Sequence, residues 1–87
     1  MYRASGVLYR DAMSDRAGRV PLEYMRVADD LAAKITSGEL VPGDRLRSEA
    51  DLADDYDVSY GTIRRAMEEL RKRGLIATAW GKGNIVR

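Results

Sequence analysis

The sequence predicts a small α+β domain made of three helices and a C-terminal β-hairpin. Apolar residues recur at helical spacing in three separate stretches of the chain. Two of these stretches are joined by only a few residues, which is the spacing of a helix-turn-helix. After the last of them, two short β-prone runs flank Gly81-Lys82-Gly83, as in a hairpin. A chain of 87 residues is long enough for one such domain with its own core.

The first helix is expected to begin at Pro21, because proline is tolerated in a first helical turn. Gly38 is expected to end it, as a residue that adopts a left-handed conformation easily. The apolar side of this helix consists of Tyr24, Ala28, Leu31 and Ile35. Residues 1–20 mix Gly, Ser, Arg and Asp with scattered apolar residues, so we expect a partly disordered N-terminal extension followed by a domain over 21–87.

A turn is expected around Pro42 and Gly43, and Arg45 to Arg47 should then be extended as a short edge strand. Ser48 precedes the second helix as its N-cap, with the carboxylate of Asp51 three residues further on. This short helix should end near Asp57 and Val58.

Ser59 is the expected N-cap of the third helix, which should cover residues 59–73 and stop at Gly74. So short a connection makes the second and third helices cross steeply. The strands of the hairpin are expected over 75–80 and 84–87, with Trp80 in the hairpin core. This order of elements describes a winged helix-turn-helix with a three-helix core. The buried stripe of the third helix should be Ile63, Ala66, Met67 and Leu70.

The charge of the chain is unevenly distributed. Residues 1–59 hold eight Lys and Arg against twelve Asp and Glu, whereas residues 60–87 hold seven Lys and Arg against two acids. The net charge of +1 therefore hides a positive region that begins at the third helix. Local positive charge of this kind attracts phosphate, although a solvated basic face is the ordinary alternative.

The start of the third helix carries side chains suited to duplex DNA. The hydroxyls of Ser59 and Thr62, with the free N–H groups of the first turn, favour a phosphate oxygen. Arg64 can reach guanine O6 and N7 or clamp a phosphate; an ion pair with Glu68 is the alternative. Tyr60 can bond a phosphate or pack on a thymine methyl, or it can be a half-buried structural tyrosine.

The remaining candidates surround this helix. Gly61 lets the helix lie close to the base edges, or is simply tolerated there, and Arg65 is a possible phosphate contact. Arg45 and Arg47, just before the second helix, can hold the DNA backbone of the same groove. Lys82 at the hairpin tip can contact a phosphate or the minor groove, unless Gly-Lys-Gly only makes the turn. The full set of candidate DNA-binding residues is Arg45, Arg47, Ser48, Ser59, Tyr60, Gly61, Thr62, Arg64, Arg65, Lys82 and Gly83.

The composition argues against other classes of protein. The chain has no Cys and no His, which removes disulfides, the usual zinc sites and most nucleophile–base pairs of enzymes. It also has no phosphate-cradling loop of Walker spacing. We expect no enzyme activity, no cofactor and no metal. The absence of a long apolar run and of a signal-peptide pattern leads us to expect a cytoplasmic protein that does not enter a membrane.

Several fixed-spacing motifs resemble the N-terminal domain of GntR-family bacterial transcription regulators. They are Gly38-x-Leu40-x-Pro42-Gly43-Asp44-Arg45-Leu46, Ser48-Glu49-x-x-Leu52-Ala53, Val58-Ser59-x-x-Thr62-Ile63-Arg64-x-Ala66-x-x-x-Leu70, Gly74-Leu75-Ile76 and Gly81-Lys82-Gly83. The resemblance covers about residues 21–87. It implies a winged-helix domain that represses or tunes transcription, with its recognition helix in the major groove and the wing glycine near the minor groove.

Three positions depart from the family pattern. Arg47 stands where proline is usual, and Ala50 stands where many members carry an arginine that touches DNA. Tyr60 and Gly61 replace a common arginine-threonine pair, which implies a different operator sequence. Members of the family normally carry a C-terminal domain that binds a metabolite and dimerises. This chain ends at the wing, so effector binding cannot be carried over, and we expect no small-molecule effector site.

The rival hypothesis is a winged-helix docking module for another protein, because fold alone does not fix function. For a DNA-binding domain of this size we expect a homodimer, assembled mainly on DNA, because one domain makes few base contacts. The apolar residues of the extension, Tyr2, Val7, Leu8, Tyr9 and Met13, are candidates for that contact.

Overall fold

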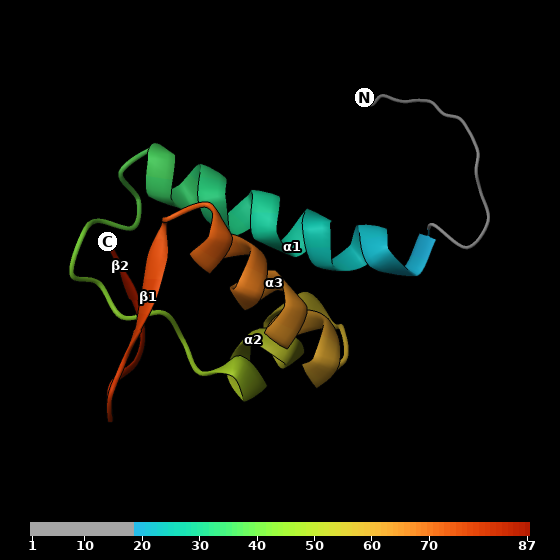
Figure 1. The fold of residues 1–87 in the computed structure, drawn as a ribbon. Coiled ribbons are helices and arrows are strands. Elements are labelled where there is room, and N and C mark those ends of the chain that lie inside the picture. The colour runs from blue at the N-terminus through green and yellow to red at the C-terminus, as the bar shows by residue number, and fades with distance from the viewer. Residues whose placement is uncertain (1–18) are drawn as a thin grey trace.

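The computed structural model describes residues 19–87, which form three helices followed by a two-stranded antiparallel sheet (Figure 1). This order confirms the predicted winged helix-turn-helix. Residues 1–18 of the expected N-terminal extension lie outside the described residues. The elements are α1 (Arg19–Thr36), α2 (Glu49–Tyr56), α3 (Tyr60–Lys72), β1 (Ile76–Ala79) and β2 (Gly83–Val86).

α1 begins at Arg19, earlier than the predicted start at Pro21. The N–H groups of a first helical turn have no acceptor within the helix, so a proline there costs no hydrogen bond. Gly38 follows the helix with a φ of +87° and donates its N–H to the carbonyl of Ile35, as expected of a residue that ends a helix.

Two serine caps set the helix-turn-helix. Ser48 Oγ accepts the N–H of Asp51 at 3.0 Å, and Ser59 Oγ accepts the N–H of Thr62 at 3.1 Å, so both predicted caps are confirmed. Between them, Asp57 takes a left-handed conformation with a φ of 56°. Aspartate tolerates this region better than most residues, and it reverses the chain within a single residue. Val58 then packs against the core, as predicted.

The sheet is joined to the loop before α2. β1 and β2 pair from Ile76↔Val86 to Ala79↔Gly83, and Arg45 forms an isolated bridge with Ile85. The N–H of Leu46 donates to the carbonyl of Asn84 at 2.9 Å. The expected edge strand over 45–47 is therefore reduced to one bridge, yet it still fixes the start of α2 relative to the hairpin.

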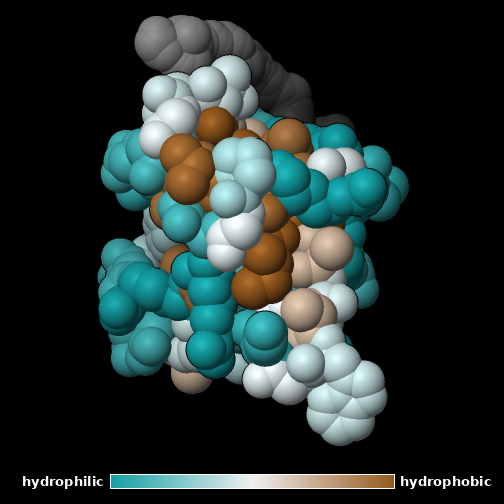
Figure 2. Space-filling view, turned by 90° about the vertical axis from the view of Figure 1, so that its left-hand side faces the viewer, coloured by the Kyte–Doolittle hydropathy of each residue, from teal (hydrophilic) through white to brown (hydrophobic). Residues whose placement is uncertain are grey.

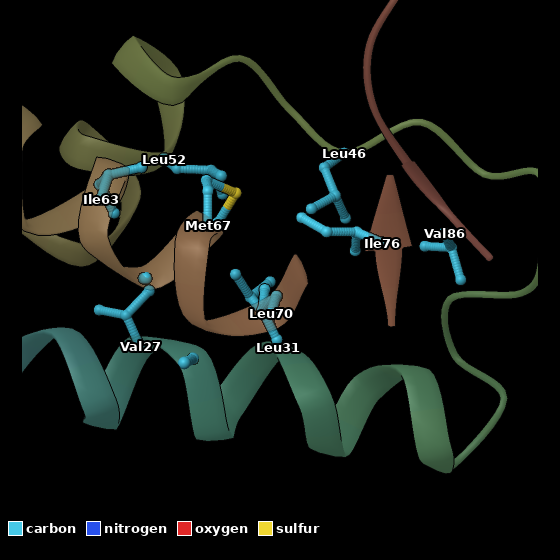
Figure 3. Close-up of a cluster of buried hydrophobic side chains, with 11 residues drawn as sticks. Val27, Leu31, Leu46, Leu52, Ile63, Met67, Leu70, Ile76 and Val86 are labelled. Atoms are coloured by element: carbon cyan, nitrogen blue, oxygen red, sulfur yellow. The ribbon is translucent and has the colours of Figure 1, made fainter. Parts of the chain in front are cut away.

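α3 occupies the centre of the core (Figure 3). Its predicted stripe is confirmed, since Ile63, Ala66, Met67 and Leu70 are all buried. α1 packs along one side of it, and Leu52 of α2 and the two strands close the rest. The residues that meet this stripe from the other elements are Val27, Ala28, Leu31, Leu46, Leu52, Ile76 and Val86. The outer side of α3 is thereby left to solvent.

The hairpin projects from the body of the molecule, and this position makes one prediction wrong (Figure 1). Trp80 was expected in the hairpin core but is 96% exposed. It follows the last residue of β1, and its neighbours Ala79 and Gly81 have too little side chain to cover an indole. On the face shown in Figure 2, hydrophobic residues gather in the middle and hydrophilic residues surround them.

Candidate nucleic-acid interface

An open groove of about 550 Å³ runs between the start of α2, the outer side of α3 and the hairpin. Residues far apart in the sequence meet in it, because the bridge between Arg45 and Ile85 brings the loop before α2 beside the wing. We call it the wing groove. The structure gathers six of the predicted site residues in its lining, namely Arg45, Arg47, Ser48, Tyr60, Arg64 and Gly83.

A second hollow lies at the N-terminus of α3, against Tyr24 of α1. We call it the cap hollow. Arg64 lines both it and the wing groove, so the two form one continuous surface around the start of α3. The remaining predicted residues of α3 line the cap hollow, namely Ser59, Gly61, Thr62 and Arg65. Only Lys82 of the predicted set lines neither hollow; it lies at the tip of the hairpin.

The alternative roles of two α3 residues can be examined in the structure. Arg64 is exposed, and within residues 23–87 no ion pair joins it to Glu68 or to another acid. Its guanidinium is therefore available to a ligand. Tyr60 is 49% exposed and lines the wing groove, so about half of its surface is open to a ligand. Neither residue is needed by the core.

Arg47 is held in place by Asp55. Its Nε donates to Asp55 Oδ2 at 2.6 Å and its Nη2 to Asp55 Oδ1 at 3.3 Å. The hydrogen bond and the charge of Asp55 raise the pKa of Arg47 further above its ordinary value, so the guanidinium stays charged. A phosphate would have to share Arg47 with this carboxylate, which makes it a weaker anion site than Arg45 or Arg64.

One cluster of the wing groove was missed by sequence reasoning. Arg71 Nη1 donates to Thr78 Oγ1 at 3.0 Å and to Asn84 Oδ1 at 3.3 Å, and the Thr78 hydroxyl donates to Asn84 Oδ1 at 2.9 Å. Among the described residues, Asn84 is the one polar residue that is buried. The cluster braces the hairpin against the end of α3. Arg71 lies in the last turn of α3, and nothing in the local sequence pairs it with Thr78.

Arg73, the C-cap residue of α3, serves the fold. Arg73 Nε donates to Glu69 at 2.9 Å and its Nη2 lies 2.9 Å from Asp29 Oδ1, which ties the end of α3 to α1. Tyr56 donates its hydroxyl to Asp30 and so ties α2 to α1. Burial and this hydrogen bond raise the pKa of Tyr56, which keeps the hydroxyl protonated as a donor. These contacts hold the helices that carry the wing groove.

The hairpin tip is shaped by glycine. The N–H of Lys82 donates to the carbonyl of Ala79 at 2.9 Å, and Gly81 has a φ of +74°, a conformation that a β-turn of this kind reserves for glycine. Gly83 also has a positive φ, +79°, and lines the wing groove with its backbone. Lys82 is exposed between them.

Among the described residues, no three His, Cys, Asp or Glu side chains are placed to hold a metal ion. Over residues 19–87 no helix has the length and apolar character needed to cross a membrane.

Comparison with known proteins places this geometry in a family. The profile of "Bacterial regulatory proteins, gntR family" matches residues 23–86, which is most of the chain. The chain is 36% identical over 75 residues to the HTH-type transcriptional regulator SmoD of Agrobacterium fabrum, covering 86% of this chain and 32% of that protein. It is 37% identical over 75 residues to the histidine utilization repressor of Klebsiella aerogenes, covering 86% of this chain and 31% of that protein. The chain thus spans about a third of the length of these relatives.

Solved structures with the same fold include a DNA complex. The DNA-binding domain of AraR in complex with operator ORR3 is 26% identical, with a TM-score of 0.73, over 97% of this chain and 93% of that one. YtrA from Sulfolobus acidocaldarius, a GntR-family transcription factor, is 33% identical, with a TM-score of 0.69, over 74% of this chain and 67% of that one. These similarities do not favour the protein-docking alternative.

Proposed function

Because the chain belongs to the gntR family of bacterial regulatory proteins, we propose that residues 21–87 bind operator DNA and regulate transcription, as a repressor. α3 enters the major groove. The wing, residues 81–83, touches the adjacent minor groove or its phosphates. The family is one of regulators, not of enzymes. Bacterial DNA lies in the cytoplasm, so a protein that binds it would act there.

The observation that carries this proposal is the wing groove. Residues from the loop before α2, from α3 and from β2 line one open surface, and Arg45 and Arg64 bring positive charge to it. Within residues 23–87 neither of these two arginines forms an ion pair. An open groove with unpaired arginines beside an exposed helix face suits a phosphate backbone and base edges better than an apolar partner helix.

The proposed contacts follow from position. Arg64 and Tyr60 read base edges or bind phosphate from the exposed side of α3, and Gly61 allows the helix to approach. Ser48, Ser59 and Thr62 offer hydroxyls and helix-start N–H groups to phosphates. The remaining candidates contact the DNA backbone on either side of the groove that holds α3. They are Arg45, Arg47, Arg65, Lys82 and Gly83.

The experiment is a fluorescence-anisotropy titration of duplex DNA over a range of salt concentrations, after selection of bound sequences from random duplexes. With about four to six phosphate contacts, the slope of log K against log salt should be roughly −4 to −5 per protomer. Binding that does not respond to salt would refute the proposal and would favour the docking module.

We further propose that two copies pair on inverted half-sites, with the N-terminal extension or α1 in the contact. A single domain makes few base contacts, and two-fold pairing on a palindrome is the usual remedy. Sedimentation of the full chain, and of a chain that begins at Gly18, should show a dimer with operator present. If both remain monomeric on DNA and bind one half-site with unchanged affinity, pairing is excluded.

A further inference from the structure

The most exposed large apolar side chain of the described residues is Trp80, at the tip of the hairpin. It is 96% exposed, compared with 49% for Tyr60 and 46% for Val41. An indole left in water forgoes the free energy that its burial would supply, and tryptophan is a residue that usually finds cover. The isolated chain therefore places its largest apolar side chain where the fold makes no use of it.

The local backbone holds this position open. Gly81 follows with a φ of +74°, and Lys82 closes the turn onto Ala79, so the tip contains no other bulky apolar group. The hairpin projects away from the helices, and no part of the described chain lies over its tip (Figure 1). Trp80 and Lys82 thus both lie exposed in the turn at the far end of the wing.

Trp80 also lies next to the part of the hairpin that lines the wing groove. Thr78 of β1 lines this groove, and Trp80 lies in the turn, one residue past the end of the strand. Gly83, opposite Ala79, lines the same groove with its backbone. The wall that the wing gives to the groove therefore ends at the turn that holds Trp80 and Lys82. In the proposed complex the wing touches the minor groove next to the α3 site, so this turn lies beside that groove.

We propose that Trp80 is a DNA-contacting residue whose indole packs against the deoxyribose rings and base edges of the minor groove next to the α3 site. This inference rests on the proposed function. Lys82 contacts the phosphates that border the same groove. The apolar indole suits the sugar rings that line the groove, as the apolar side chains that other proteins insert into minor grooves do. The contact depends on the width and the floor of the minor groove, which vary with DNA sequence. It therefore adds sequence selectivity at base pairs that α3 does not contact.

The chain contains one tryptophan, so its intrinsic fluorescence reports on this residue alone. The full chain is titrated with a selected duplex while labelled-DNA anisotropy is measured in parallel. Acrylamide serves as the quencher because a neutral quencher is not repelled by DNA. Saturation with duplex should lower the quenching constant of Trp80 by about threefold or more, as its surface leaves water.

A second readout tests the minor groove directly. Inosine in place of guanine removes the N2 amino group, the only donor on the minor-groove edge, and leaves the major-groove O6 and N7 unchanged. The duplex is substituted at the base pairs beside the α3 site. The affinity of the unaltered chain should change with this substitution, and that of the Trp80→Ala chain should not.

Trp80→Ala should weaken binding of the selected duplex by about tenfold, and Trp80→Phe should restore most of the loss. Val41→Ala is the matched control, since it shortens an exposed apolar side chain that does not line the wing groove, and it should leave affinity unchanged. None of these exposed substitutions should alter the thermal unfolding midpoint.

Intact DNA binding with Trp80 as accessible to acrylamide as before would overturn the inference and leave the proposed function in place. Protection of Trp80 that grows with protein concentration in the absence of DNA would also overturn it, because the occupant would then be a second copy of the chain. Absence of any duplex binding by anisotropy would overturn the proposed function itself.

Discussion

The guanidinium of Arg65 lies over the ring of Tyr24, with its central carbon 4.4 Å from the ring centroid. This contact joins the exposed side of α3 to α1 at the edge of the cap hollow. A cation–π pair at an exposed site contributes about 0.5–1 kcal/mol. Arg65 was predicted as a phosphate contact, and the structure gives it a second partner that fixes where its charge is held.

We predict a measurable coupling between these two residues. In a double-mutant cycle, Arg65→Met and Tyr24→Leu should couple by about 0.5–1 kcal/mol in the free energy of unfolding, measured by urea titration. Arg64→Met is the matched control, because Arg64 neighbours it on α3 but lies over no ring in the described residues. A coupling indistinguishable from that of Arg64 would mean that the stacking contributes nothing.

Arg64 and Lys82 should differ in how they affect binding. Arg64→Ala should cost about 1–3 kcal/mol on the selected site and relax the preference at one base pair. Lys82→Ala should weaken binding to all sequences about equally and make the salt slope shallower by about one. Both are measured by anisotropy on selected and random duplexes. Equal losses on both duplexes for Arg64→Ala would assign it to a phosphate.

Gly61→Ala should change stability and binding in opposite directions. A Cβ at this position would meet only Ser59 Oγ, at 3.9 Å, so the fold has room for it. Alanine favours a helix over glycine, and near a helix start the gain should be about 0.5 kcal/mol. The same methyl group would stand between α3 and the bases and lower affinity about tenfold. Unchanged affinity in a stabilised variant would show that α3 does not approach the bases at Gly61.

Arg71 should act on binding through the hairpin. Arg71→Met removes its hydrogen bonds to Thr78 and Asn84, which should cost about 0.5–1.5 kcal/mol of stability and weaken operator binding without changing the salt slope. Lys72→Met is the control in the same helical turn, and it should leave stability unchanged. A salt slope shallower by about one for Arg71→Met would instead identify Arg71 as a direct phosphate contact.

Features governed by local chemistry could be predicted from the sequence. The caps at Ser48 and Ser59, the stop at Gly74 and the apolar stripe of α3 all depend on residues within one or two helical turns, and the structure agrees with each. The predicted DNA-binding residues remain predictions. The structure brings most of them onto one continuous surface.

Contacts between distant elements could not be predicted in this way. The Arg47–Asp55 pair, the Arg71 brace and the Arg65–Tyr24 stacking each depend on how two elements lie against one another, which no local periodicity encodes. Trp80 was misplaced for a related reason. Its β-prone character is real, but the sheet has only two strands and its tip extends past the helices that would have covered an indole.

The division of α3 into two sides has a consequence for how such regulators diversify. Every residue that α3 gives to the core lies on the stripe of Ile63, Ala66, Met67 and Leu70, whereas Tyr60, Gly61, Arg64 and Glu68 are exposed. Substitutions on the exposed side cost little folding free energy, and those on the stripe cost several kcal/mol, about 2–5 for a large-to-small change. Under the proposed reading of the operator by α3, evolution can therefore change operator preference one residue at a time while the scaffold stays intact. The same separation lets an engineer randomise four positions and select new binding sites from chains that still fold.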